Sequence, residues 1–196
     1  MAQGQREVDA LGLSGVGVHH VADPAGARGD HEPILVSFAC VRQHVAEFPT
    51  GSATLREGAY RETMSRHGLQ QHIRVVQADL SEHSGFEAMN SLIGSGRTPT
   101  AVFAANDILA VGALSAADDH GLGVPSRLSL DGYDSTYLAG IRHLSLTSVD
   151  PVSRDVGVRA AQLLVERMAD PSLPQRAEVL RPRLVIRNST APAFKG

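Results

Sequence analysis

The stretch that most constrains the fold of this chain runs from Thr98 to Gly121. It begins with a short apolar run, Ala101 to Ala105, which is typical of a strand inside a parallel sheet. Apolar residues then recur at helical spacing, and Gly121 is placed to end the helix. Asn106 and Asp107 stand between the two elements, and we expect Asp107 to be the N-cap. This unit predicts polar side chains at the carboxyl end of a strand, where open α/β sheets bind their ligands.

A second short strand, Leu128 to Leu130, leads to Gly132, Tyr133 and Asp134. We expect it to end at the same edge of the sheet. Asp107 caps a helix whatever the function, and Asp134 is a common turn residue, so these structural roles stay open beside a ligand-binding one. Acidic side chains after two neighbouring strands nevertheless favour a binding site at this edge.

Composition bounds the class of protein. The chain has 196 residues, of which 42% are hydrophobic, enough for one or two domains with a sizeable core. It contains no run of about 18 apolar residues and no basic start before an apolar segment, so we expect no export, no membrane span and a cytoplasmic location. The net charge of -3, with scattered Lys and Arg, argues against nucleic-acid binding by this chain alone. A single cysteine, Cys40, excludes an internal disulfide.

Strands and helices alternate along the rest of the chain. The spacing of apolar residues and the positions of turn residues predict helices over 54–68, 86–93, 135–142 and 153–169. Strands are expected at 15–21, 44–48, 73–78, 144–149 and 184–186, and residues 34–41 form a further apolar stretch. Such alternation predicts an α/β fold with a doubly wound parallel sheet.

Five motifs resemble, in their order, the effector-binding region of the LacI/GalR (lactose-repressor/galactose-repressor) family of bacterial transcription regulators. They are Ala105-Asn106-Asp107, Gly121–Pro125, Gly132-Tyr133-Asp134, Leu146–Val149 and Leu184–Thr190. The family's R-x-x-G-[FY] helix start looks like Arg56 to Tyr60, with Ala59 where glycine is usual. The match covers about Ser52 to Pro192. The resemblance implies a periplasmic-binding-protein-like fold, two α/β subdomains around a sugar cleft.

The resemblance also implies a domain division. Residues 1–52 would form a partial N-terminal subdomain, 53–145 the C-terminal subdomain, 146–170 the return segment of the N-terminal subdomain, and 171–196 the last strand of the C-terminal subdomain and the tail. The family's N-terminal helix-turn-helix has no counterpart, so DNA contact is expected only through a headpiece outside this chain. Asp131 departs from the family pattern because it stands at a normally apolar strand position.

The resemblance implies an effector site made of Arg56, Asn106, Asp107 and Asp134, with Tyr133 and Asp150 as second-rank candidates. Carboxylates accept hydrogen bonds from sugar hydroxyl groups, and a guanidinium donates several hydrogen bonds in one plane, so these residue types suit a polyhydroxylated ligand. The expected partners are a small-molecule effector, in the first place a sugar, and a second copy of the chain in a homodimer. We expect no cofactor, no metal and no catalytic residue.

Two other functions stay open. A stand-alone sugar-binding protein of a transport system would share the fold and would need an export signal. A hydrolase or isomerase would have to use Asp107 and Asp134, although no nucleophile and base are paired in these motifs. His19, His20 and His31 lack a second cluster at ligand spacing and do not predict a metal site.

Overall fold

A six-stranded sheet forms the centre of the protein. The computed structural model describes residues 35–40, 52–96 and 98–192. The strands are β1 (Leu35–Cys40), β2 (Arg74–Ala78), β3 (Ala101–Ala104), β4 (Ser129–Tyr133), β5 (Thr147–Asp150) and β6 (Arg183–Val185), in the spatial order β2-β1-β3-β4-β5-β6. The first five run parallel, and β6 pairs antiparallel with β5. The prediction of a parallel sheet is therefore wrong for the last strand, where the chain returns directly beside β5.

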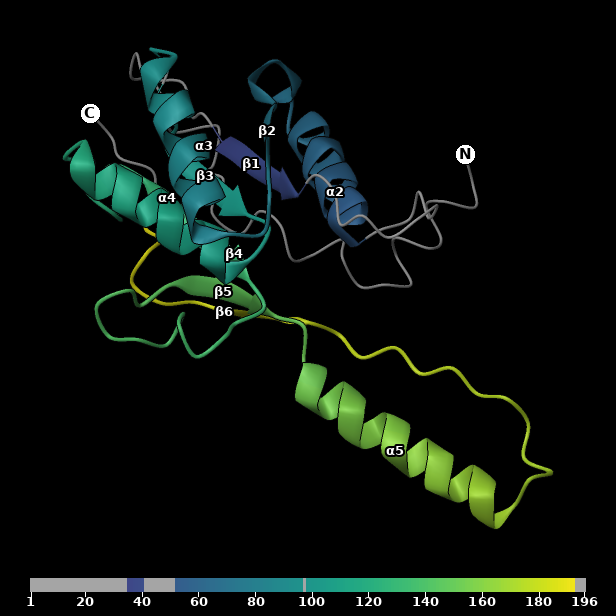
Figure 1. The fold of residues 1–196 in the computed structure, drawn as a ribbon. Coiled ribbons are helices and arrows are strands. Elements are labelled where there is room, and N and C mark those ends of the chain that lie inside the picture. Colours follow the sequence, from purple (N-terminus) through teal and green to yellow (C-terminus); the bar gives the residue numbers. More distant parts are fainter. Residues whose placement is uncertain (1–34, 41–51, 97, 193–196) are drawn as a thin grey trace.

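Helices cover both faces of the sheet. They are α2 (Ser52–Arg66), the short 3-10 helix η2 (Gln70–His72), α3 (Glu82–Gly94), α4 (Asp107–Asp119) and α5 (Ser153–Ala169). The connection through α2 runs from β1 outward to β2, whereas those through α3 and α4 run in the opposite direction. Because such crossovers are right-handed, α2 lies on one face and α3 with α4 on the other, as Figure 1 shows. The predicted doubly wound α/β architecture is confirmed.

The core lies between the sheet and the pair α3 and α4. It is built from small and aliphatic side chains, including Met89, Leu92, Val102, Leu109, Ala113 and Leu130. Gly85 and Gly112 bring the two helix backbones into contact. A Cβ atom at Gly112 would lie 1.9 Å from the carbonyl oxygen of Glu82, and one at Gly85 would lie 2.2 Å from that of Leu109. Both positions therefore require glycine.

Most predicted elements are confirmed. The helix predicted over 153–169 is α5, and those predicted over 54–68 and 86–93 correspond to α2 and α3. The strand predicted over 73–78 is β2, and the apolar stretch 34–41 contains β1. The strands predicted at 15–21 and 44–48 lie outside the described residues.

The prediction of a helix over 135–142 is wrong. This segment is a series of turns, in which Ala139 N donates to Thr136 O and Ile141 N donates to Leu138 O. Its start, Ser135, has a φ of 43°, which is incompatible with a right-handed helix. The strand predicted from Leu144 begins only at Thr147, because Ser145 also has a positive φ of 39°.

The predicted subdomain boundaries fall inside one sheet. β1 precedes the expected boundary at residue 52, yet it pairs with β2 and β3, which both come after that boundary. β5 follows the expected boundary at residue 145 and pairs with β4. The division of the chain into two subdomains stays a prediction.

Helix α5 and the chain that returns from it extend away from the sheet as an arm, residues 153–182 (Figure 1). No residue of α5 is buried. Arg159 binds Glu178 at 2.5 Å, and Arg176 pairs with Glu166, so ion pairs hold the returning chain against the helix. Among the described residues, no helix is long and apolar enough to cross a bilayer.

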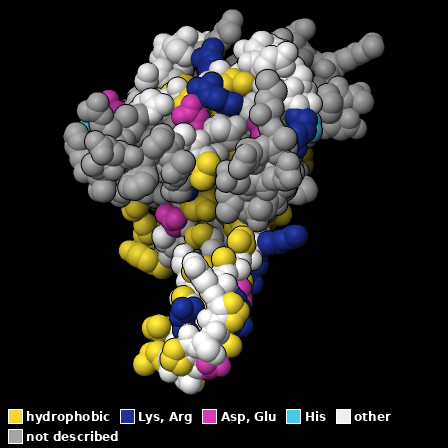
Figure 2. Space-filling model, turned by 90° about the vertical axis from the view of Figure 1, so that its right-hand side faces the viewer, with side chains coloured by type: hydrophobic (Ala, Val, Ile, Leu, Met, Phe, Trp, Pro, Cys, Tyr) yellow, Lys and Arg dark blue, Asp and Glu magenta, His cyan; other side chains and the backbone are white. Residues whose placement is uncertain are grey.

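One side of α5 carries an exposed apolar stripe. Its members recur at helical spacing and are Val158, Ala161, Leu164, Val165 and Met168. Met168 is 72% exposed and Val165 64%. Figure 2 shows hydrophobic side chains along the arm below the body of the molecule.

We predict that Gly112→Ala lowers the free energy of unfolding by at least about 2 kcal/mol, because the new methyl group meets the backbone of α3. The matched control is Gly58→Ala, inside α2, where a Cβ meets nothing within 4 Å. That change should stabilise the protein by about 0.5–1 kcal/mol. Urea unfolding measures both, and equal effects at the two positions would contradict the close helix contact.

Asp131 makes stability depend on pH. It is half-buried on β4, and desolvation raises the pKa of its carboxyl group to about 7. The folded state therefore binds this proton more tightly than the unfolded chain, and the corresponding stability is lost as pH rises from about 4 to 7. We predict that Asp131→Asn gains up to about 2 kcal/mol over the parent between pH 5 and pH 8. Thermal unfolding across this range measures the difference, with Asp118→Asn, at an exposed position of α4, as the control.

Candidate functional site

The predicted site residues gather at one edge of the sheet. Parallel strands β1, β3, β4 and β5 end there, and the residues that follow them begin the next elements. Arg56 lies in the first turns of α2, Asn106 and Asp107 follow β3, Tyr133 ends β4, and Asp150 ends β5. Asp134 follows Tyr133 directly. This is the edge at which open α/β sheets bind ligands.

Asn106 is the N-cap of α4, not Asp107 as predicted. The Asn106 Oδ1 atom accepts a hydrogen bond of 2.8 Å from Leu109 N, and Asn106 has the extended backbone of a capping residue. The helix thus begins one residue earlier than the apolar pattern indicated. The amide nitrogen of Asn106 is not needed for the cap.

Asp107 is a buried structural carboxylate, with 1% of its surface exposed. Its Oδ1 atom accepts a bond of 2.5 Å from Ser148 Oγ. Its Oδ2 atom accepts bonds from the backbone nitrogen and the hydroxyl of Thr136, at 2.6 and 2.8 Å. Both oxygens are therefore engaged inside the protein, and the predicted contact of Asp107 with an effector would have to compete with these bonds.

The sequence carries a signal for the hydrogen bonds that Asp107 accepts, namely two hydroxyl residues in or beside neighbouring motifs. Ser148 lies in the Leu146–Val149 motif, and Thr136 stands two residues after Asp134. Both residues carry hydroxyl groups, and both lie close to Asp107, which follows β3. Hydroxyl groups this close to a buried carboxylate serve as its donors.

Arg56, Tyr133 and Asp134 form a second group at the same edge. The guanidinium carbon of Arg56 lies 4.3 Å from the centre of the Tyr133 ring, a cation–π contact. The Arg56 Nε atom is buried and has no hydrogen-bond partner in the described part of the chain. An unsatisfied donor of this kind is expected to bind an acceptor from outside the protein.

The charges of Asp107 and Arg56 both act on the carboxyl group of Asp134. Desolvation raises the pKa of its carboxyl group, the negative charge of Asp107 raises this pKa further, and the positive charge of Arg56 lowers it. The residue itself is exposed and has a positive φ of 96°. The exposed Asp134 therefore lies within the electrostatic reach of a cation and of a buried anion.

Asp150 shapes the start of α5. Its Oδ1 atom accepts a hydrogen bond of 2.7 Å from Val152 N, and its other oxygen lies 3.8 Å from Arg183. Val152 has a left-handed backbone, with φ at 54°, which is rare for a β-branched residue. Asp150 is thus part of the turn into the arm, and its contact with an effector stays a prediction.

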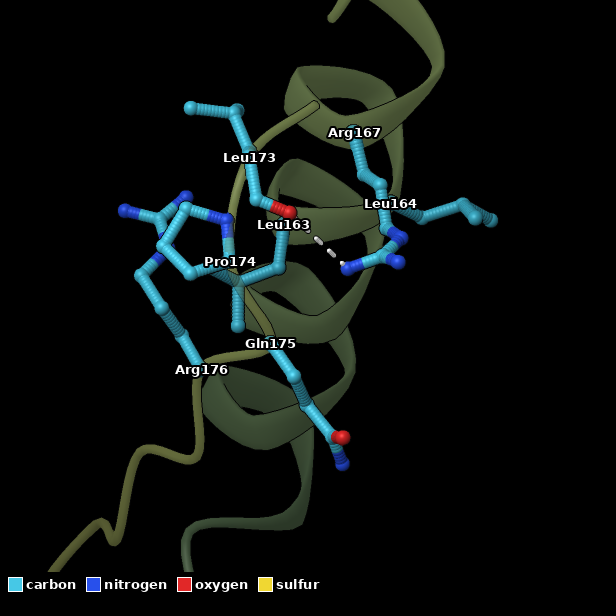
Figure 3. A pocket seen from close by; sticks show the side chains of 7 residues that line it. All are labelled: Leu163, Leu164, Arg167, Leu173, Pro174, Gln175 and Arg176. Carbon is cyan, nitrogen blue, oxygen red and sulfur yellow. Dashed lines mark hydrogen bonds between the residues drawn. The ribbon is translucent and has the colours of Figure 1, made fainter. Parts of the chain in front are cut away.

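A cavity of about 320 Å³ lies elsewhere, within the arm. The cavity is lined by Leu163, Leu164 and Arg167 of α5 and by residues 173–176 of the returning chain; in Figure 3 the Leu164 side chain points away from the returning chain. Arg167 donates a bond of 3.2 Å to the carbonyl oxygen of Leu173 across it. None of the predicted site residues lines this cavity. In the described residues, no three His, Cys, Asp or Glu side chains gather as a metal site would require.

Comparison with known proteins identifies the family. The profile described as "Periplasmic binding protein-like domain" matches residues 36–190. A LacI-family transcriptional regulatory protein from Corynebacterium glutamicum shares 35% identity and superposes with a TM-score of 0.67 over 81% of this chain and 58% of its own. This chain belongs to the LacI/GalR family. The resemblance and the fold class predicted from the sequence are both confirmed.

Two further relatives are regulators with different names. The HTH-type transcriptional repressor PurR of Pasteurella multocida is 33% identical over 144 residues, which are 73% of this chain and 43% of the repressor. The transcriptional regulator CelR, solved as a cellobiose complex, is 26% identical with a TM-score of 0.65, over 80% of this chain and 46% of its own. The chain therefore spans less than half the length of both relatives.

We predict that the two neighbouring polar residues contribute differently to stability. Asn106→Ala removes a cap and should cost about 1 kcal/mol, whereas Asp107→Ala leaves several buried donors unpaired and should cost about 3 kcal/mol or more. Urea unfolding of the two variants measures the difference. Asn106→Ser, which can still cap α4, is the control and should keep parental stability. A larger cost for Asn106→Ala than for Asp107→Ala would contradict these roles.

Proposed function

We propose that this chain is the effector-sensing and dimerising region of a LacI-type transcription regulator, and that its effector is a sugar or a related small molecule. The observation that carries the proposal is the group formed by Arg56, Tyr133 and Asp134 at the carboxyl edge of the sheet. One cation with an unpaired donor, one carboxylate and one aromatic ring lie together there.

These groups suit a polyhydroxylated ligand. The Arg56 guanidinium donates hydrogen bonds, and its buried Nε atom gains a partner when a hydroxyl oxygen arrives. Both carboxylate oxygens of Asp134 can accept hydrogen bonds from ligand hydroxyl groups, and the Asn106 amide nitrogen can donate a further bond. A ligand that lacks one of the matching hydroxyls leaves a group unpaired, at a cost of about 1–3 kcal/mol. The cellobiose complex of CelR supports a sugar as the first class to test.

The exposed stripe on α5 supports a second lobe. An apolar row as exposed as Leu164, Val165 and Met168 is expected to be covered in the working protein. We propose that α5 packs against residues of the N-terminal subdomain, according to the division predicted from the sequence, and that the effector binds between the two lobes. A ligand that prefers the closed arrangement then shifts the equilibrium by its differential affinity.

The remaining partners follow from the same proposal. DNA is bound through a headpiece outside this chain, the protein acts in the cytoplasm, and it forms a homodimer. Catalysis is not proposed, since the Asp107 carboxylate is buried and engaged by Ser148 and Thr136, which leaves it unable to serve as an acid or base for a substrate.

A thermal-shift screen with sugars, nucleosides and nucleobases tests the proposal. An effector present at about 100 times its dissociation constant should stabilise the protein by about 2.7 kcal/mol. Asp134→Ala should weaken the binding of that effector at least tenfold and leave the fold intact, because Asp134 is exposed. Asp118→Ala, on the exposed end of α4, is the matched control. Folded protein that no compound stabilises, or a hit that Asp134→Ala binds as tightly as the parent, would contradict the proposal.

A further inference from the structure

The turn after β4 has an unusual backbone. Asp134 and Ser135 are consecutive non-glycine residues with positive φ angles, 96° and 43°. L residues rarely adopt this region, and such backbones persist where the surrounding structure holds them. Asp134, the proposed effector contact, therefore depends on whatever keeps this turn in shape.

Hydrogen bonds from several elements hold the turn. Asp134 N donates to Val149 O at 2.9 Å, and Ser135 N donates to Ser148 Oγ at 3.0 Å. The Ser148 hydroxyl in turn donates to Asp107. These contacts come from β5 and from the start of α4, which both adjoin the same edge of the sheet.

A further contact comes from a distant part of the sequence. Arg187 follows β6, 52 residues after Ser135, and its Nη2 atom donates a bond of 3.2 Å to Ser135 Oγ. Its Nη1 atom donates a bond of 2.6 Å to Leu146 O, just before β5. Arg187 N also donates to Thr147 Oγ1 at 2.9 Å, so the backbone of this residue is anchored as well.

This geometry suits arginine specifically. The planar guanidinium presents separate nitrogen atoms in a rigid fork, and here one reaches the strand entry while the other reaches the turn. A lysine ammonium group at this position has neither the fork nor the fixed direction of its donors. Because Leu146 O is a backbone acceptor next to β5, the fork ties the turn to the sheet.

We propose that Arg187 is a positioning residue for the effector site: its guanidinium holds the turn formed by Asp134 and Ser135 at the edge of the sheet where Arg56 and Tyr133 lie. The part of this inference that concerns the effector rests on the proposed function. The part that concerns the shape of the turn does not. Arg187 touches no effector; it acts through Ser135.

Solution NMR of the full 196-residue chain tests the shape of the turn without a ligand. In Arg187→Gln, the backbone chemical shifts of residues 134 and 135 should move away from left-handed values. The pKa of Asp134 should fall toward its ordinary value, because desolvation and the negative charge of Asp107 raise it in the parent. Resonances of the core between α3 and α4 should stay in place. A general structural role for Arg187 would disturb the core resonances as well.

Two further variants keep the test decisive. Ser135→Ala removes the same contact and leaves the bond from Arg187 to Leu146, so it replaces Arg187→Gln if that variant fails to fold. In a Ser135→Gly background the Oγ acceptor is gone and the left-handed backbone needs no support, so Arg187→Gln should have little further effect on the turn. Unchanged shifts and an unchanged Asp134 pKa in Arg187→Gln and Ser135→Ala would overturn the inference.

Binding of cellobiose and of D-ribose, measured by calorimetry, tests the consequence. For a sugar that binds the parent, Arg187→Gln should weaken affinity at least tenfold, whereas Arg127→Gln, at an exposed position just before β4 and so at the opposite end of the strands, should change it less than twofold. Parental affinity in Arg187→Gln would overturn the positioning role. If neither sugar binds the parent, the proposed function fails for these two sugars, and the NMR result still decides what Arg187 does.

Discussion

The buried carboxylate of Asp107 is the interaction on which the edge of the sheet depends. Its two oxygens join the start of α4 to the turn after β4 and to β5, through Thr136 and Ser148. In a low-dielectric interior such charge-assisted bonds are strong when satisfied and costly when broken. Gly132 is required by the same carboxylate, because a Cβ there would lie 2.5 Å from Asp107 Oδ1.

Asp107 and Asp134 show how burial separates two acidic residues that look alike in sequence. Both follow strands that end at the same edge. Asp107 is enclosed and hydrogen-bonded to its neighbours, whereas Asp134 is exposed and is influenced by the charges of both Asp107 and Arg56. The first therefore maintains the arrangement of the strands, and the second is available to a ligand.

Elements with strong periodicity could be predicted from the sequence, and those shaped by side-chain contacts could not. Helix α5 was predicted to its ends because Pro171 follows it and its apolar residues recur regularly. The turn after β4 was mistaken for a helix, since its positive φ angles are imposed by Ser148 and other distant partners that no local pattern reveals.

The candidate site shows the same limit. Chain position placed Asn106, Asp107, Tyr133 and Asp134 at one edge, because parallel strands end together, whereas Arg56 and Asp150 were candidates through the family resemblance. The role of each residue depends on whether its side chain is buried and on which groups it binds. Asn106 took the capping role predicted for Asp107, since either residue type caps a helix and only the hydroxyls of Thr136 and Ser148 decide which one is buried.

The way the arm is attached limits how it can move. The chain leaves the sheet at Asp150 and returns at Arg183, and these two residues are paired directly across β5 and β6. Their Cα atoms therefore lie about 5 Å apart, as opposite residues of antiparallel strands do. Both ends of the arm are therefore joined to the sheet at one place. Any movement of α5 pivots there, and β5, whose Val149 carbonyl oxygen accepts the hydrogen bond from Asp134 N, carries one of the two attachments.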